Sequence, residues 1–365
     1  MVTDSEPLRN FEGCRNTAGC FTGEVLCRIQ RPVPKKSTFF LSLSACLSSL
    51  LLYLPSYGQI LENKPSYIGT TDLTFNAAFV KAGKIKKITA YFSDKPDNQV
   101  IVDKGLVKCY EFDTAGNVTR YYFTTVKSVE AVEVKVPAVY KKGRKVSPAT
   151  VKTEYVYTYD TTFTWFAYDK TGRVIMKRSN VGDVFNTHYY EYDINGFFAK
   201  ETVCKETNKN LNNIHHFELG IQIVISEETF QYVFQSPTQL KRLCLNDEGK
   251  VYKTGIINFS KTLVEENYSF AVGYVRYGNL FEYDASGKLI KKTLIPDANA
   301  DLRNIFTYEY TVDGILLTEK RYKNETQVNN IVYMYDDQTK LLKSILNREH
   351  DKANIVITKF VYEYY

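Results

Sequence analysis

The chain has 365 residues, of which 44% are hydrophobic, so it is long enough for one large domain or two ordinary ones with a packed core. Tyr and Phe contribute 29 and 22 residues, and aromatic side chains favour strands over helices, so we expect a nearly all-β chain. The net charge of +6 is spread over interleaved basic and acidic residues, which argues against a nucleic-acid-binding surface. The densest basic cluster is typical of a solvated hairpin tip and comprises Lys141, Lys142, Arg144 and Lys145 around Gly143.

The N-terminal region carries the parts of a secretory signal. Lys35 and Lys36 precede an apolar stretch, Phe39–Leu54, and the small residues Ser56 and Gly58 follow at the −3 and −1 positions of a cleavage site. A basic segment, an apolar segment and small residues at a cleavage site together define a signal peptide. We therefore predict a signal peptide over residues 35–58 with cleavage after Gly58, and a mature protein in the periplasm, on the outer surface or secreted.

Three further interpretations concern this region. Residues 1–34 show no hydrophobic periodicity, and we interpret them as a non-structural extension that precedes a later translation start. Leu43-Ser44-Ala45-Cys46 resembles a lipidation site, so one alternative to a free mature protein is a lipid anchor at Cys46. The other alternative is an apolar segment that stays uncleaved and anchors the protein in the membrane.

Three cysteines remain after cleavage and allow one disulfide at most: Cys109, Cys204 and Cys244.

A short motif recurs through the rest of the chain. Its clearest copy runs from Phe281 through Tyr283-Asp284 and Gly287 to Leu289. Two gaps between copies are about twice the usual step, which indicates either a decayed copy or an inserted longer hairpin. Seven copies centre on Phe112, Tyr168, Tyr192, Leu245, Tyr283, Tyr310 and Tyr335, and the chain ends on the opening half of another at Tyr362-Glu363-Tyr364.

The spacing of Asp and Gly in the motif predicts a tight hairpin turn. Asp at the first turn position can cap the turn's own backbone, and Gly at the fourth can take the left-handed conformation of a bulged type I turn. The predicted turn residues are Asp113, Gly116, Asp169, Gly172, Asp193, Gly196, Gly249, Asp284, Gly287 and Gly314.

This turn also predicts the register of the flanking strands. The last aromatic before the turn should face an apolar residue after it, and such cross-strand pairs each contribute roughly 0.2–1 kcal/mol. The predicted pairs are Phe112 with Val118, Tyr168 with Val174, Tyr192 with Phe198, and Tyr283 with Leu289. One step further from the turn, the same register places Arg120, Lys200 or Lys291 over an outer aromatic ring such as that of Phe281.

The Tyr-Asp-x-x-Gly core is similar to the YD-repeat, or rearrangement-hot-spot, family. The core stands at Tyr168-Asp169, Tyr192-Asp193 and Tyr283-Asp284, and the likeness covers most of residues 105–365. The resemblance implies an antiparallel sheet that curls or spirals, an extracellular or envelope setting, and an association with carbohydrate binding. The period here is longer and less even than in the family, and no toxin domain follows, so a toxin-delivery role is not carried over.

These patterns predict an all-β fold, an antiparallel β-meander of repeated hairpins that forms a long curved or spiralling sheet. The pattern does not distinguish a spiral from a closed barrel. We expect an N-terminal β region at 59–150 with long Val-rich strands, followed by the hairpin repeats at 151–365.

The sequence shows no catalytic, cofactor or metal motif, so we predict a protein that is not an enzyme. The adjacent pair His215-His216 would point to opposite faces of a strand, and the repeated Asp residues fit turn capping better than glycoside hydrolysis. We expect a binding or structural module for an envelope glycan or a surface protein, with no nucleic-acid partner and membrane contact only through the signal or Cys46. The alternatives are a scaffold that binds another envelope protein through sheet edges and, more weakly, a carbohydrate-active enzyme.

Overall fold

The described part of the chain is almost entirely β-strand. In the computed structural model it comprises residues 58–365 without 66, 70, 183, 211–215, 259–261, 272–273 and 298–300. The predicted extension 1–34, the signal peptide up to residue 57, and Cys46 lie outside it. The strands are β1 (Ile85–Pro96), β2 (Val102–Phe112), β3 (Val118–Val136), β4 (Val139–Lys141), β5 (Arg144–Ser147), β6 (Thr150–Tyr168), β7 (Val174–Val181), β8 (Val184–Tyr192), β9 (Phe198–Asn208), β10 (Leu219–Ser236), β11 (Gln239–Leu245), β12 (Val251–Asn258), β13 (Leu263–Ala271), β14 (Tyr274–Tyr283), β15 (Leu289–Ile295), β16 (Asn304–Tyr310), β17 (Leu316–Lys323), β18 (Thr326–Tyr335), β19 (Leu342–Glu349) and β20 (Asn354–Tyr364).

One short helix accompanies these strands in the described residues. Helix α2 spans Ala77–Ala82, and the side chain of Asn76 caps it by accepting hydrogen bonds from the amides of Ala78 and Phe79. In this part of the chain no helix has the length and apolar character needed to cross a membrane.

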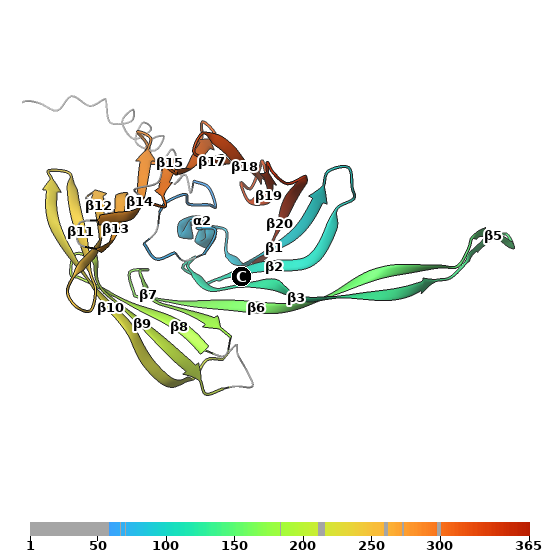
Figure 1. Cartoon of the computed structure of the whole chain (residues 1–365), viewed down its shortest axis with the longest axis horizontal. Helices are drawn as coiled ribbons and strands as arrows, with labels where there is room; N and C mark the ends of the chain where they lie inside the picture. Colours follow the sequence, from blue (N-terminus) through green and yellow to red (C-terminus); the bar gives the residue numbers. More distant parts are fainter. Residues whose placement is uncertain are drawn as a thin grey trace, which may run out of the picture. The chain divides into compact units, whose positions relative to one another are not determined.

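The strands form a closed barrel (Figure 1). Within the described residues, 18 strands pair antiparallel in chain order, with β3 pairing directly to β6 because β4 and β5 form a separate hairpin between them. The last strand, β20, pairs back to β1 from Ile85↔Tyr364 to Pro96↔Asn354. The expected meander of hairpins is confirmed, but the expected spiral is wrong. The half-copy of the motif at Tyr362-Glu363-Tyr364 lies in β20 and pairs with β1, a strand that carries no copy of the motif.

The motif turns have a common backbone geometry. At Asp284 the backbone N–H donates to Lys288 O (2.9 Å), and the side-chain Oδ1 accepts hydrogen bonds from the amides of Ser286 and Lys288 (2.9 Å each). The turn glycines have φ between +72° and +90°, which only glycine adopts without strain. They are Gly116, Gly172, Gly196, Gly249, Gly287 and Gly314.

The strand directions place one copy differently from the others. In the antiparallel order, the motif turns after β2, β6, β8, β14, β16 and β18 lie at one end of the barrel. The turn after β11 lies at the opposite end, because an odd number of strands separates it from the turn after β8. In this inverted copy Leu245 pairs with Val251 on the outer face, and Val251 is exposed.

The predicted ladder pairs lie opposite one another on the lumenal face. Phe112 pairs with Val118, Tyr168 with Val174, Tyr192 with Phe198, and Tyr283 with Leu289. The tyrosine hydroxyl adds a link between neighbouring hairpins, because it donates to a backbone carbonyl of the preceding one. Such bonds join Tyr168 to Val118 (2.8 Å), Tyr192 to Val174 (2.7 Å), Tyr310 to Leu289 (2.6 Å) and Tyr362 to Leu342 (2.6 Å).

The predicted stacking of a cation on the outer aromatic is wrong by one residue. A second bulge at Ile290 shifts the register, so that Lys291 faces Glu282 and Phe281 faces Lys292. The same shift pairs Arg120 with Glu111 and Lys200 with Glu191. Arg120, Lys200 and Lys291 therefore lie on the outer face, where they form ion pairs with Glu111 (2.6 Å), Glu227 (2.7 Å) and Glu282 (2.7 Å).

The seventh turn is one residue longer than the others, which yields a stability prediction. Lys340, not Thr339, has the positive φ (+57°), and the Thr339 hydroxyl donates to Asp336 Oδ1 (2.9 Å). We expect Lys340→Gly to stabilise the protein by about 1 kcal/mol, because a left-handed residue with a Cβ is strained. Thr339→Gly should destabilise it, because it removes that hydrogen bond and loosens the unfolded chain. Urea unfolding of the two variants checks this, and equal midpoints would contradict the assigned turn.

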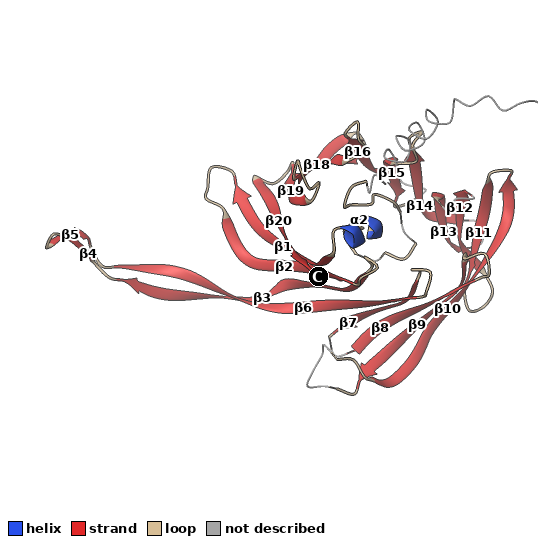
Figure 2. Cartoon of the chain, turned by 180° about the vertical axis from the view of Figure 1, so that it is seen from behind, coloured by secondary structure: helices blue, strands red, loops and turns tan. Residues whose placement is uncertain are grey.

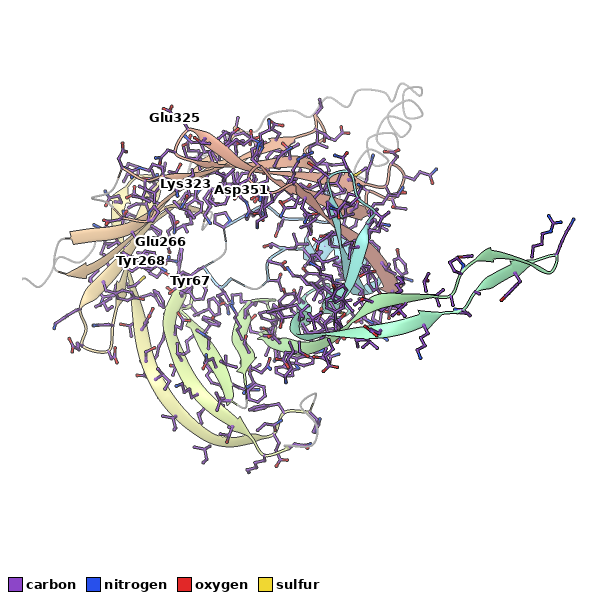
Figure 3. All side chains as sticks on the ribbon, turned by 45° about the vertical axis from the view of Figure 1, so that its right-hand side comes forward. Tyr67, Glu266, Tyr268, Lys323, Glu325 and Asp351 are labelled. Atoms are coloured by element: carbon purple, nitrogen blue, oxygen red, sulfur yellow. The ribbon has the colours of Figure 1, made fainter. Side chains whose placement is uncertain are left out.

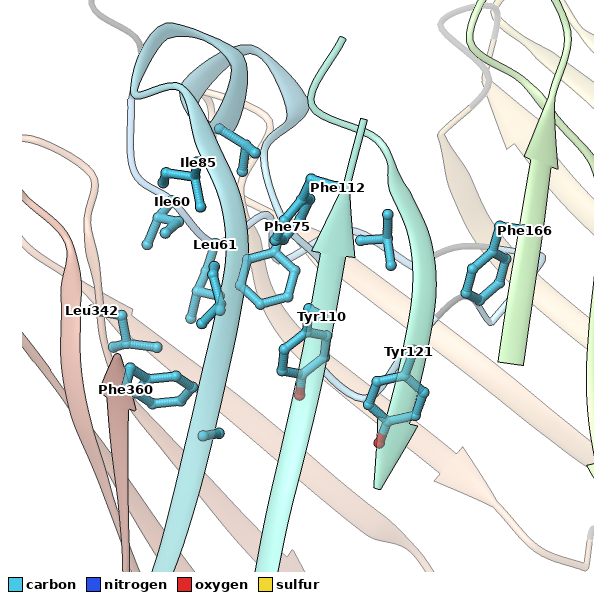
Figure 4. Close-up of a cluster of buried hydrophobic side chains, with 14 of the residues drawn as sticks. Ile60, Leu61, Phe75, Ile85, Tyr110, Phe112, Tyr121, Phe166, Leu342 and Phe360 are labelled. Atoms are coloured by element: carbon cyan, nitrogen blue, oxygen red, sulfur yellow. The ribbon is translucent and has the colours of Figure 1, made fainter. Parts of the chain in front are cut away.

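The N-terminal segment, residues 58–84 without 66 and 70, lies inside the barrel, and we call it the plug (Figure 2). Ile60, Leu61 and Phe75 are buried against wall residues such as Tyr110 and Leu342 (Figure 4). The plug is a small structure of its own, since Leu61 bridges to Phe75, and it is fastened to the wall by polar contacts. Three of these are Leu316 N–H to Gln59 Oε1 (2.6 Å), Tyr110 OH to Asp72 Oδ1 (2.7 Å), and Asn63 Nδ2 to the Tyr310 hydroxyl (2.9 Å).

One pair of strands leaves the barrel as a long ribbon (Figure 1). β3 and β6 pair from Arg120↔Trp165 to Val136↔Thr150, far beyond the reach of their wall neighbours β2 and β7. The ribbon accounts for one wide gap between motif copies, and the long strands β9 and β10 account for the other. The boundary that we placed between residues 150 and 151 falls at the start of β6, so the two predicted regions share one sheet.

Candidate functional site

A cluster of buried charges lies on the lumenal face of the wall, and we call it the lumenal charge cluster: Arg242, Lys253 and Glu266. The three residues come from β11, β12 and β13 and are 4%, 7% and 7% exposed. Glu266 Oε1 lies 3.1 Å from Arg242 Nη2 and 2.9 Å from Lys253 Nζ. Its Oε2 accepts hydrogen bonds from Asn279 Nδ2 (3.0 Å) and the Tyr268 hydroxyl (3.3 Å). One carboxylate thus holds two cations that have lost most of their water.

Tyr67 of the plug covers this cluster (Figure 3). Its ring lies 4.3 Å from the Arg242 guanidinium and 4.4 Å from Lys253 Nζ, so both cations contact the ring face. Its hydroxyl donates to Glu201 Oε2 (3.3 Å), and the same carboxylate contacts His188 Nδ1 (2.8 Å). Burial, followed by the Glu201 charge, raises the pKa of Tyr67 far above its usual range. Tyr67 is therefore a neutral hydrogen-bond donor that ties the plug to two parts of the wall.

A cavity of about 250 Å³ lies between the plug and the wall strands β15–β18. The plug contributes residues 61–64 and 72–74, and the wall contributes aromatic faces from Phe306, Tyr308 and Tyr333. The wall also contributes Lys292, and burial lowers the pKa of this lysine. Its lining also carries the charged residues Glu62, Lys64, Asp72, Glu319 and Arg321.

A second buried carboxylate lies on the outer face of the wall. Glu206 of β9 accepts hydrogen bonds from Arg178 Nε (2.8 Å), Thr187 Oγ1 (2.6 Å) and the Tyr189 hydroxyl (2.6 Å). Burial alone would raise the pKa of Glu206, but these donors hold it below its usual range. Phe217, from the β9–β10 connection, covers Arg178 at 3.8 Å. The site is fully partnered and packed, so we assign it a structural role.

The residues predicted from sequence line the lumen and its turns rather than a shared pocket. The aromatic–aliphatic ladder is part of the buried core, and the turn residues lie at the ends of the barrel. Trp165 stacks on Phe163 (5.8 Å between ring centres) on the outer face, whereas Tyr168 lies on the lumenal face. Within the described residues, no group of three or more His, Cys, Asp or Glu side chains could hold a metal ion. The cysteines of the described residues are buried free thiols: Cys109, Cys204 and Cys244.

Sequence reasoning missed the lumenal charge cluster and the cavity. Arg242, Lys253 and Glu266 stand in three different strands with no motif in common. One signal was present: Arg242 shares its strand face with Cys244, an inward position, and a charged residue on an inward face needs a partner. The plug could not be found this way, because its segment carries neither the motif nor a clear period.

Comparisons with known proteins identify no family. No family model matches the chain, and no curated protein matches it. Among solved structures, a porin-like protein from Bacteroides uniformis has a TM-score of 0.36 at 11% identity, covering 76% of this chain and 98% of that one. The Tc holotoxin pore of Photorhabdus luminescens (TM-score 0.17, 12% identity) and a TcdB2–TccC3 complex (0.18, 13%) cover 71% and 68% of this chain. This chain spans 21% and 14% of those two chains. At such TM-scores these likenesses carry no argument about function.

Proposed function

We propose that this protein is an exported binding module of the cell envelope, whose β3–β6 ribbon adds strands of a partner protein to its edges. The observation that carries the proposal is the free ribbon. From Thr125 to Val136, β3 pairs with β6 and with no other strand in the described part of the chain. A sheet edge with unpaired N–H and C=O groups is a ready template for a partner strand. The wall strands are paired on both sides over most of their length; residues 219–228 of β10, which among the described strands pair with β9 alone, form a second and shorter free edge.

The ribbon is long, exposed and apolar for a surface element. Residues 125–136 extend over roughly 40 Å at the usual rise of a strand. Val129 and Tyr155 lie on one face and are 50% and 62% exposed, and Val156 on the other face is 50% exposed. An isolated two-stranded hairpin is marginally stable in water, so a third strand would stabilise it. This favours a protein partner bound through sheet edges over a glycan bound on a flat face.

The outer face of the barrel wall is rich in ion pairs, which favours contact with water over contact with lipid. Ion pairs cross between neighbouring strands at Lys87–Glu363 (2.7 Å), Glu111–Arg120 (2.6 Å), Glu282–Lys291 (2.7 Å) and Glu309–Lys320 (2.6 Å). The lumenal face, in contrast, carries the aromatic ladder. A membrane-spanning barrel has the opposite arrangement, with an apolar band outside and a polar lumen. The proposed site of action is therefore the periplasm or the outer surface, reached through the signal at residues 35–58.

A site-specific cross-linking experiment tests the proposal. A photoreactive amino acid replaces Tyr155 on the ribbon or, as a matched control, Tyr91 on the barrel wall, which is 44% exposed. In the native host we expect one discrete protein adduct from position 155 and none from position 91. A variant in which residues 127–157 are replaced by a two-residue turn should keep the barrel and lose the partner.

Two results would count against this function. Equal labelling from both positions would mean that the ribbon is not a specific surface. Binding to a glycan array that the ribbon-trimmed variant retains would instead support the carbohydrate-binding module expected from the repeat family.

A further inference from the structure

The described lining of the lumenal cavity contains one lysine that makes no ion pair. Glu62 is paired with Lys64 (2.9 Å), and Glu319 with Arg321 (2.6 Å). Asp72 is paired with Lys108, which lies outside the lining. Among the described residues, Lys292 is then the one lining cation without a carboxylate in ion-pair contact.

The bulge at Ile290 is what places this lysine in the lumen. Without it, Lys291 would face inward and Lys292 outward; with it, Lys292 faces Phe306 and Lys291 faces Glu282 on the outside. Lys292 Nζ lies 5.9 Å from the ring centre of Phe281 and 5.6 Å from that of Phe306. Ring faces stabilise a cation only in part, and Glu266 and Glu319 act on Lys292 without ion-pair contact, so burial still lowers the pKa of this lysine.

We propose that the lumenal cavity binds a small sugar acid, whose carboxylate pairs with Lys292 and whose ring packs on Tyr308 and Tyr333. One lysine without an ion pair matches a monoanion, whereas a phosphate dianion would add a second, unpaired negative charge. The volume of about 250 Å³ lies below the roughly 300–1,000 Å³ of pockets for drug-sized ligands, which limits the ligand to about one sugar ring. Tyrosine rings with polar edges suit a ring that carries hydroxyl groups.

The adjacent lysines provide a matched pair for the test. Glucuronate is titrated into the mature protein by calorimetry, with glucose and inorganic phosphate as comparison ligands. We expect Lys292→Gln to weaken glucuronate binding by at least about thirtyfold, the loss typical of a buried charge pair that is broken. Lys291→Gln, on the outer face, should leave the affinity unchanged.

A second measurement uses the unmodified protein, so that the test does not depend on the folding of a variant. Reductive methylation followed by mass spectrometry should label Lys292 in the free protein and less so with glucuronate present, while Lys291 is labelled equally in both. The proposal fails if glucuronate gives no protection, if glucose or phosphate binds as tightly as glucuronate, or if Lys292→Gln binds as well as the unmodified protein.

Discussion

Glu266→Gln is expected to lower the free energy of unfolding by about 3–5 kcal/mol, the range seen when one member of a buried ion pair is removed. The substitution keeps the shape of the side chain but removes the one carboxylate that balances Arg242 and Lys253. Both cations would then be buried beneath the Tyr67 ring without a counter-charge. Urea unfolding followed through the fluorescence of the single tryptophan, Trp165, measures the change.

The matched control for this prediction is Glu282→Gln. Glu282 also pairs with a lysine, Lys291 at 2.7 Å, but its side chain is 52% exposed on the outer face. Exposed ion pairs contribute at most about 1 kcal/mol, so this variant should unfold near the midpoint of the unmodified protein. Similar losses in the two variants would show that Glu266 is not buried as the lumenal position requires.

Gly116→Ala is expected to destabilise the protein by about 3–4 kcal/mol, against about 1–2 kcal/mol for Gly287→Ala. Both glycines are the left-handed residue of a motif turn, with φ of +90° and +80°. A Cβ at Gly287 meets nothing within 4 Å, so that variant reports backbone strain alone. A Cβ at Gly116 would lie 2.1 Å from the Ala77 carbonyl oxygen at the start of α2, so the plug helix must move away.

The difference between the two glycine variants measures how firmly the plug docks on the wall. Hydrogen exchange should show faster exchange of α2 amides in Gly116→Ala and unchanged exchange there in Gly287→Ala. Equal unfolding midpoints, with α2 equally protected in both, would mean that the plug does not rest on the β2–β3 turn.

The local geometry of the repeats could be predicted from sequence because Asp and Gly act within a few residues of each other. Asp284 caps its own turn and Gly287 needs a left-handed backbone, so the pairing of Tyr283 with Leu289 follows from the turn chemistry. The next pair could not be predicted. The bulge at Ile290 leaves no mark in the residue types, and a shift of one residue exchanges the inner and outer faces.

The closed shape and the lumenal site depend on contacts between distant residues, which a single sequence does not reveal. β1 lacks the motif, so nothing in its residues marks it as the partner of Tyr362 and its neighbours. The same holds for Tyr67, whose ring covers two cations that lie far along the chain at Arg242 and Lys253. Charged residues on the inward faces of strands were the one available sign that the lumen holds more than a hydrocarbon core.

The pairing of β20 with β1 also sets the order in which this protein can fold. Ile85 begins the first wall strand and Tyr364 ends the last, and contacts of such long sequence separation are slow to form because of the entropy lost on closing the loop. The hairpins are local and can form early, whereas the ring can close only after the last strand is available. Until then the strand edges of β1 and β19 and the aromatic ladder face water, a state prone to aggregation. The plug, which precedes every wall strand in the chain, offers Ile60, Leu61 and Phe75 as a surface on which successive hairpins can assemble before the ring closes.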